Sequence, residues 1–457
     1  MKIKQLLFIS FATVLIHACS SSKKIPIVIS QTIQDTLSQK IQDTLSQKIK
    51  DTVANNSIPE IDHSKTDTFL LNILREYPQY FDNILKNRKE WNVQIIYTEI
   101  NRDKNNTPHF TDHYFNVDPG KYFYPASTVK LPIALLALQK LNELSNTGIT
   151  KNTSMITEAD YGGQAPTYND PQTVDGRPTI ESYIKRIFLV SDNEAFNRLY
   201  EFLGQQYINK QLHDKGYEDA QILHRLDIFL SEDQNRHTNP IEFLDSNNNV
   251  LYSQPLVFNK ETYSERHDSL GDAYYSNGEL RNGPMNFSKK NRISLEDLHQ
   301  ILRSAIFPDN VPVKRKFNLT KNDYEFIHQY MSQFPPESIY PSYDSAAYPD
   351  AYAKFLLYGS QKDPLPKNIR IFNKEGDAYG QLIDVAYISD FDNKIEFFLS
   401  ATIYCNANGI LNDDKYDYDT IGLPFMKNLG QAIYHHELKR KRTYQPDLSL
   451  FKLTYDK

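Results

Sequence analysis

Segments typical of β-strands lie at both ends of the chain, with a mostly helical stretch between them. Near the start, residues 91–100 (WNVQIIYTEI) alternate and are rich in β-branched side chains, and a partner strand follows after a polar turn. One antiparallel sheet closed by both chain ends satisfies this order, so we predict a mixed α/β fold. Its form is an α+β three-layer sandwich with helices on both faces and an all-helical subdomain. The later candidates are strands over 370–372, 382–388 and 395–403 and a helix over 424–437.

The composition excludes several classes of protein. The chain has 457 residues and a formal net charge of −6, with 40% hydrophobic and 24% charged residues. These values exclude a polytopic membrane protein and a chain kept disordered by its own charge. The acidic balance, 57 Asp plus Glu against 51 Lys plus Arg, also excludes the basic surface of a nucleic-acid-binding protein. Two cysteines, Cys19 and Cys405, are too few for a disulfide framework.

Residues 1–18 have the layout of a bacterial signal peptide. Lys2 and Lys4 form a positive head, residues 6–16 are mostly apolar, and the small residue Ala18 precedes Cys19. The apolar run is too short for a membrane-spanning helix. A cysteine in this place, followed by three serines and two lysines, resembles the lipobox of a bacterial lipoprotein, in which the cysteine becomes the lipidated amino terminus. A secreted protein with an unmodified Cys19 is the alternative.

An eight-residue repeat follows this segment. Residues 33–40 read IQDTLSQK, residues 41–48 repeat them letter for letter, and residues 49–56 read IKDTVANN. Solenoid repeats are much longer, and apolar residues at every fourth position drift around a helix. We therefore predict that residues 19–64 are a polar tether that leads to a globular domain over 65–438.

The most informative motif, S-T-V-K from Ser127 to Lys130, stands at the start of a long apolar helix predicted over 127–144. Residues three apart lie on one helical face, so the Ser127 hydroxyl and the Lys130 amine can form a hydrogen bond. A serine becomes a strong nucleophile when a base takes its proton, and a lysine whose pKa is lowered by burial can be that base. A helix N-cap is the alternative interpretation of Ser127.

Two further motifs carry side chains suited to the same chemistry. In the S-D-N sequence that begins at Ser191, the hydroxyl could relay protons and Asn193 could donate a hydrogen bond to a substrate carbonyl. A plain turn or helix cap is the alternative there. The K-E-G sequence from Lys374 to Gly376 is predicted on a strand, where the lysine faces a cleft and the glycine allows substrate to approach closely.

Together the three motifs resemble the S-x-x-K, S-D-N and K-T-G signatures of the serine β-lactamase and penicillin-binding protein superfamily. Their order and context agree, and the separation of the first two suits a class A β-lactamase-like domain. The resemblance covers residues 66–436 and implies an oxyanion hole formed by the backbone N–H groups of Ser127 and of a residue near Asp377. It implies catalytic roles for Ser127, Lys130 and Ser191, and substrate-binding roles for Asn193, Lys374, Gly376 and Asp377.

Two features depart from the family pattern. Glu375 replaces the hydroxyl residue of K-T-G, which in the family helps to bind the substrate carboxylate, and a glutamate that points into the site would repel that group. Strand alternation relative to Lys374 would turn residue 375 away from the cleft, but the hydroxyl residue of the family has the same nominal orientation, so alternation does not remove the conflict. Class A enzymes also carry a deacylating glutamate in an E-x-x-L-N pattern. The matching region, 223–244, offers Glu232 and Glu242, and neither stands in that pattern.

Two segments add to the family domain. Residues 228–287 form an insertion rich in Asn, Asp, Ser and Tyr, in which short runs at 250–252 and 256–258 predict a hairpin. Residues 439–457 begin with a basic cluster and are predicted to be a solvated C-terminal extension. The histidines show no metal-ligand spacing, so we predict no metal and no cofactor.

We therefore expect a lipid-anchored serine hydrolase of the bacterial cell envelope, facing the periplasm or the cell surface, that hydrolyses a β-lactam amide through an acyl-enzyme on Ser127. A D-alanyl-D-alanine peptidase or cell-wall amidase stays open, as does a sensor that binds its ligand without turnover. The expected partners are a β-lactam or peptidoglycan-type peptide and the membrane, with no nucleic acid, and the expected state is a monomer.

Replacing Cys19 tests the lipid anchor. A triacylated cysteine anchors a protein stably, so Cys19→Ala is expected to move the protein from the membrane fraction to the soluble fraction. Cell fractionation measures the change. Unchanged membrane association of the variant would contradict the prediction.

Overall fold

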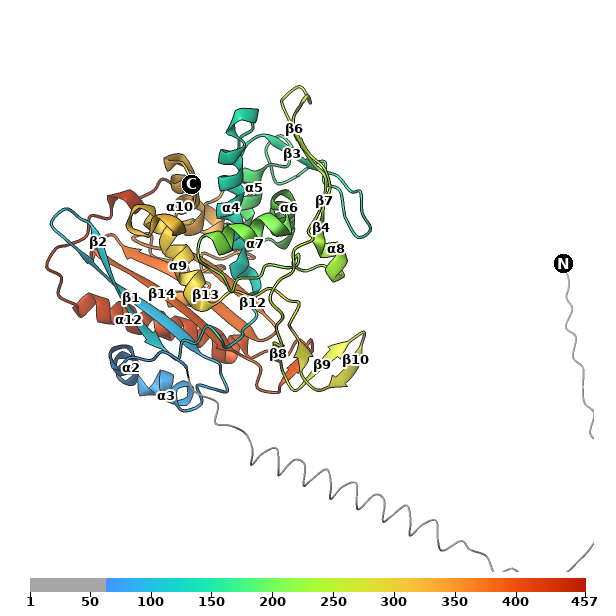
Figure 1. The fold of residues 1–457 in the computed structure, drawn as a ribbon. Coiled ribbons are helices and arrows are strands. Elements are labelled where there is room, and N and C mark those ends of the chain that lie inside the picture. Colours follow the sequence, from blue (N-terminus) through green and yellow to red (C-terminus); the bar gives the residue numbers. More distant parts are fainter. Residues whose placement is uncertain (1–62) are drawn as a thin grey trace, which may run out of the picture. The chain divides into compact units, whose positions relative to one another are not determined.

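An antiparallel sheet joins strands from both ends of the domain (Figure 1). A computed structural model describes residues 63–457, so the predicted signal peptide, Cys19 and the repeats lie outside the described residues. The five strands are β1 (Gln94–Arg102), β2 (Pro108–Phe115), β12 (Ile369–Ala378), β13 (Gln381–Asp390) and β14 (Ile395–Tyr404). Their order is β12-β13-β14-β1-β2, and every neighbouring pair is antiparallel. The predicted sheet closed by both chain ends is confirmed.

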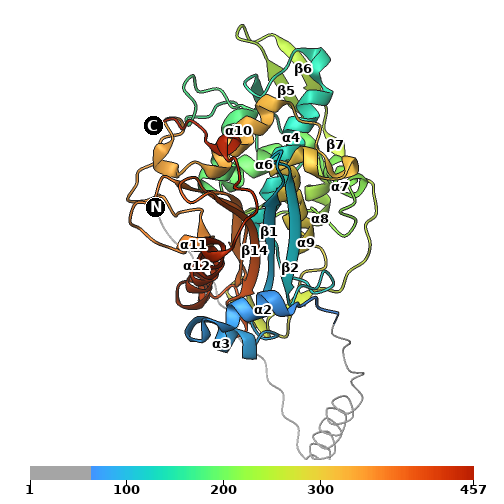
Figure 2. The ribbon, with the colours of Figure 1, turned by 90° about the vertical axis from the view of Figure 1, so that its left-hand side faces the viewer.

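Helices cover both faces of this sheet and complete the predicted three layers (Figure 2). Because both faces are covered, every residue of β13 is buried. A new helix begins at Pro78, since proline lacks an N–H and suits a first turn. One face carries α2 (Thr68–Arg75), α3 (Pro78–Lys86), α11 (Phe355–Tyr358) and α12 (Leu423–Lys439), and the other carries α9 (Leu295–Ile306) and α10 (Lys321–Ser332).

The middle of the chain forms a mainly helical subdomain. Its helices are α4 (Lys130–Glu143), α5 (Ile180–Val190), α6 (Asn193–Leu203) and α7 (Gln205–Asp214). Helix α4 is apolar on nearly all sides, and it is accordingly buried among its neighbours. Within residues 63–457, no helix is both long enough and apolar enough to cross a membrane.

Small sheets accompany these helices, so the subdomain also contains strands. A three-stranded sheet consists of β3 (Ser154–Thr157), β5 (Ile241–Leu244) and β6 (Val250–Gln254). The predicted hairpin between 250–252 and 256–258 is wrong, because β6 pairs with β5, and β7 (Val257–Phe258) pairs with β4 (His237–Thr238). The turn of the observed hairpin lies between β5 and β6. There the Asp245 carboxylate accepts hydrogen bonds from the backbone N–H groups of Asn247 and Asn249.

The rest of the insertion packs as short elements. Strands β9 (Ala273–Ser276) and β10 (Glu279–Asn282) form a hairpin, and β9 also pairs in parallel with β15 (Ile410–Leu411), which comes from the C-terminal part of the chain. This contact brings the insertion beside residues that follow β14. The other short elements of the insertion are α8 (Glu232–Arg236), β8 (Ser269–Leu270) and β11 (Met285–Asn286).

The free thiol of Cys405 is fully buried after β14. Gly422 packs against it so closely that a Cβ atom there would lie 2.7 Å from the sulfur. Burial raises the pKa of the thiol above its ordinary value. The sulfur therefore behaves as a small apolar group in the core.

The C-terminal segment 439–457 is not a solvated extension, and that prediction is wrong. Phe451 is 1% exposed, and its ring contacts those of Phe307, Phe372 and Tyr387. Near the end, the Tyr455 ring lies 3.8 Å from the Arg370 guanidinium. The segment returns to the core because its few apolar and aromatic side chains fill the space between the sheet and α10.

Truncating Phe451 tests the contribution of this segment. Phe451→Ala removes a buried ring, so the free energy of unfolding is expected to fall by about 3–5 kcal/mol. Leu450→Ala is the matched control, since Leu450 is 59% exposed and its loss is expected to change stability by less than about 0.5 kcal/mol. Urea denaturation measures both variants, and equal small effects would show that the segment is not part of the core.

Candidate active site

Ser127 lies in a short 3-10 turn, η1 (Ala126–Val129), that leads directly into α4. The preceding residue, Ala126, has a φ of 47°, which side chains with a Cβ rarely adopt. Such strain persists where the surroundings fix the backbone, and here β12 packs against the turn. No side chain caps η1 or α4, so the N-cap interpretation of Ser127 is excluded.

Lys130 is the first residue of α4 and is completely buried. Its Nζ lies 2.8 Å from Oγ of Ser127 and 2.7 Å from Oδ1 of Asn193, and it also bonds the backbone oxygen of Ser191. Burial, followed by the nearby charge of Lys374, holds the pKa of Lys130 well below its usual value. A neutral amine can donate to Asn193 and Ser191 while its lone pair accepts the Ser127 proton.

Ser191 and Asn193 come from the junction of α5 and α6. Ser191 ends α5 with a φ of 59°, and Asp192 caps α6 by accepting a hydrogen bond from the Ala195 N–H. The resulting sharp turn points the Ser191 hydroxyl between two lysines, 3.3 Å from Nζ of Lys130 and 2.9 Å from Nζ of Lys374. A hydroxyl in this position can transfer a proton from one side of the site to the other.

Strand β12, at the edge of the sheet, supplies the third predicted motif. Gly376 approaches the nucleophile so closely that a Cβ atom there would lie 2.7 Å from the backbone nitrogen of Ser127 and 2.9 Å from that of Thr128. A glycine is therefore required at this contact. Asp377 follows at the cleft surface, where partial burial and the Glu375 carboxylate raise its pKa.

Glu375 neither turns away from Lys374 nor stands free in the cleft. Its side chain is buried, and Oε1 accepts a hydrogen bond of 2.7 Å from Nζ of Lys374. Burial alone would raise the pKa of the Glu375 carboxyl, but the adjacent ammonium keeps it below its usual value. The two side chains therefore form a buried ion pair beside the nucleophile.

A cleft of about 370 Å³ opens in front of Ser127. Lys130, Ser191 and Lys374 stand behind this surface, so the structure brings together all seven predicted site residues of the domain. Residues after β15 also contribute to the wall. The lining includes Ser127, Asn193, Asp227, Asp377, Tyr379 and Asp414.

Comparison with models of known protein families identifies the family of this chain. The model of the beta-lactamase enzyme family matches residues 78–307, just over half of the chain. The chain belongs to the beta-lactamase enzyme family. The match ends before β12, so the contacts of Lys374, Glu375 and Gly376 are known from the structure and not from the family model.

Solved structures of several β-lactamases resemble this family member at low identity. The β-lactamase of Sphaerobacter thermophilus is 12% identical, with 83% of this chain and 100% of that chain covered and a TM-score of 0.43. The class A β-lactamase of Clostridium kluyveri is 14% identical (78% and 98% covered, TM-score 0.44), and PBP-A is 16% identical (82% and 97% covered, TM-score 0.44). No curated protein sequence matches the chain. The assignment therefore depends on the family model alone.

Asp227 is a carboxylate of the cleft that the sequence did not predict. The Asn197 amide fixes the residue before it, donating to the Leu226 oxygen at 2.9 Å and accepting from the Leu226 N–H at 2.8 Å. Arg225 anchors the same loop by donating to the buried Glu201 carboxylate at 2.8 Å. A search for a glutamate in E-x-x-L-N misses Asp227, although aspartate carries the same group on a shorter side chain.

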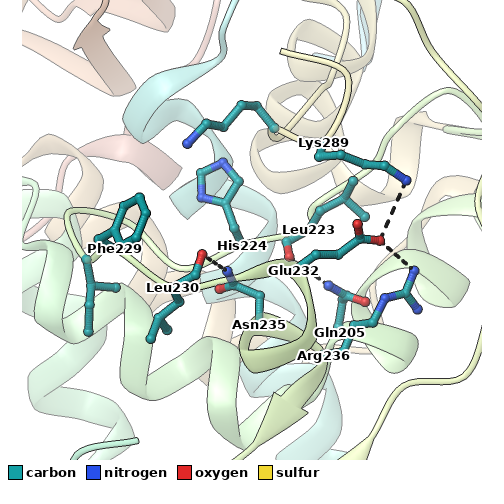
Figure 3. A pocket seen from close by; sticks show the side chains of 11 residues that line it. Gln205, Leu223, His224, Phe229, Leu230, Glu232, Asn235, Arg236 and Lys289 are labelled. Carbon is teal, nitrogen blue, oxygen red and sulfur yellow. Dashed lines mark hydrogen bonds and ion pairs between the residues drawn. The ribbon is translucent and has the colours of Figure 1, made fainter. Parts of the chain in front are cut away.

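The two glutamates that the sequence offered lie elsewhere. Glu232 begins α8 and faces a second pocket, where it pairs with Arg236 at 3.2 Å and Lys289 at 3.6 Å (Figure 3). His224 lines that pocket and stacks on Tyr124, a residue of the Ser127 cleft. Glu242 lies within β5, and neither glutamate lines the cleft of this β-lactamase family member.

The close contact at Gly376 predicts a steric effect on activity. Gly376→Ala would force the Cβ against the backbone of Ser127, so acylation of Ser127 is expected to slow at least tenfold. This corresponds to an increase of about 1.4 kcal/mol in the activation free energy. Gly162→Ala is the matched control, because a Cβ there meets nothing within 4 Å. The rate of labelling by a fluorophosphonate measures both variants, and wild-type labelling of Gly376→Ala would contradict the prediction.

Proposed function

We propose that this β-lactamase family member is a serine hydrolase that cleaves an amide of the β-lactam type through an acyl-enzyme on Ser127. The observation that carries the proposal is the 2.8 Å contact between the Ser127 hydroxyl and the completely buried amine of Lys130. A lysine whose pKa is lowered can take the hydroxyl proton near neutral pH. The family assignment supports the same type of reaction.

Acylation follows from the contacts of the two side chains. Lys130 accepts the proton of Ser127 while Oγ attacks the carbonyl carbon, and Asn193 and the Ser191 backbone hold the amine in place. The predicted oxyanion hole is formed by the backbone N–H groups of Ser127 and of a residue near Asp377. The close packing of Gly376 on η1 supports their convergence, and we assign the second group to Asp377. As the amide bond breaks, the Ser191 hydroxyl passes the proton from Lys130 to the leaving nitrogen.

Hydrolysis of the acyl-enzyme needs a base that activates water. Asp227 is our candidate because it lines the same cleft as Ser127, on a loop fixed by Asn197 and Arg225. Its carboxylate would accept a proton from water as the water oxygen attacks the ester carbonyl. When the ester bond to Ser127 breaks, that proton would pass from Asp227 to the Ser127 oxygen, which restores both side chains. The position of Asp227 in this cleft favours an enzyme that hydrolyses its acyl-enzyme over a sensor that stays acylated.

The location and anchoring remain part of the proposal. The layout of residues 1–22 supports attachment of the protein to the bacterial envelope through a lipid on Cys19, with the domain facing the periplasm or the cell surface. The substrate would then be a small amide or a peptide of the cell wall.

Two substitutions separate acylation from hydrolysis. With 4-nitrophenyl acetate, an uncharged acyl donor, wild-type protein is expected to show a burst of one nitrophenol per site followed by steady turnover. Ser127→Ala is expected to lose both phases and fluorophosphonate labelling, because no nucleophile remains. Asp227→Asn is expected to keep the burst and the labelling and to lose turnover by about 10²-fold or more.

Exposed residues of one surface loop provide the controls. Ser360→Ala and Asp363→Asn are expected to behave as wild type. Labelling that persists in Ser127→Ala would refute the proposed nucleophile. A burst with no turnover in wild type would favour the sensor, and unchanged turnover in Asp227→Asn would remove Asp227 from the mechanism.

A further inference from the structure

The ammonium of Lys374 has no hydrogen-bond donor left for a substrate. A lysine ammonium carries three N–H donors. Nζ of Lys374 donates to Oγ of Ser191 at 2.9 Å, to the backbone oxygen of Glu375 at 2.9 Å and to Oε1 of Glu375 at 2.7 Å. All three acceptors belong to the protein itself, and Lys374 is completely buried.

The charge of Lys374 is also compensated within the chain. Glu375 is 4% exposed, and the adjacent ammonium lowers the pKa of its carboxyl although burial acts in the opposite direction. Lys374 and Glu375 therefore carry opposite charges, and the net charge of the pair is zero. Lys130, the other lysine beside Ser127, acts as a base in its uncharged form. Neither lysine offers an uncompensated positive charge to a substrate.

The cleft surface carries the opposite charge. Asp227, Asp377 and Asp414 line it, and none of its lining residues is a lysine or an arginine. All three aspartates are exposed to the solvent of the cleft. An anionic substrate would be repelled by this wall and would find no free cation behind it, whereas a neutral or cationic substrate meets neither penalty.

We propose that the acyl donors of this site are neutral or cationic next to the scissile bond, and that Glu375 excludes donors with a carboxylate there. The inference rests on the proposed acyl-enzyme function and names its substrate class. In each turnover the Ser127 oxygen bonds to the acyl carbon, the bond to the leaving group breaks, and the leaving group receives the Ser127 proton through Lys130 and Ser191. Conventional penicillins, which carry such a carboxylate, are then poor substrates of the wild type.

A matched pair of thioesters tests the inference. Both carry the same acyl group, and their leaving groups are thioglycolate, with a carboxylate, and its carboxamide. For wild-type protein, kcat/KM is expected to be at least tenfold higher for the carboxamide. In Glu375→Thr, which removes the carboxylate and leaves Lys374 free, that ratio is expected to fall at least tenfold. Glu375→Gln keeps the packing and removes the charge, so its ratio is expected to fall in the same direction.

The controls distinguish this inference from the function on which it rests. Glu242→Thr changes a glutamate on a strand outside the cleft and is expected to keep the wild-type ratio. Fluorophosphonate labelling of Ser127 reports the nucleophile, and its absence in wild type would refute the proposed function. If wild-type protein is labelled but its kcat/KM values for the carboxamide and the carboxylate donor are about equal, the inference is overturned, whatever the variants do. An unchanged ratio in a labelled Glu375→Gln or Glu375→Thr variant would do the same.

Discussion

The hydrogen bonds around the buried amine of Lys130 connect the parts of the chain on which the site depends. They join the start of α4 to the turn between α5 and α6, two segments separated along the chain by β3 and the loops around it. Ser191 then extends the connection to Lys374 on the sheet edge. A charged ammonium would be costly in this place, so the same burial that orders the three segments also favours the uncharged base.

The parts of the site that local rules govern could be predicted from the sequence. Ser127 and Lys130 are one helical turn apart, and Lys374 and Gly376 share a strand face, so each pair was placed by its spacing alone. The sheet followed from alternation at the two chain ends. These signals are local because they depend on backbone geometry and not on partners elsewhere in the chain.

Features that depend on distant partners could not be predicted in this way. The burial of Glu375 comes with an ion pair to Lys374, a contact that strand alternation does not reveal. Asp227 reaches the cleft because Asn197 fixes Leu226, a contact that no pattern in the loop itself reveals. The C-terminal segment has too few apolar residues for a periodic signal, yet Phe451 fits a space left by the rings of Phe307, Phe372 and Tyr387. Each case is a tertiary effect that overrides a local rule.

The burial of Cys405 has a consequence for a protein proposed to work in an oxidising compartment. A lone exposed thiol there would form mixed disulfides with other chains. Gly422 closes the space over this sulfur, and any larger residue would need the core to open. The thiol can therefore react only when the domain loses its packing. Its rate of modification in the cell envelope then reports how often the domain unfolds.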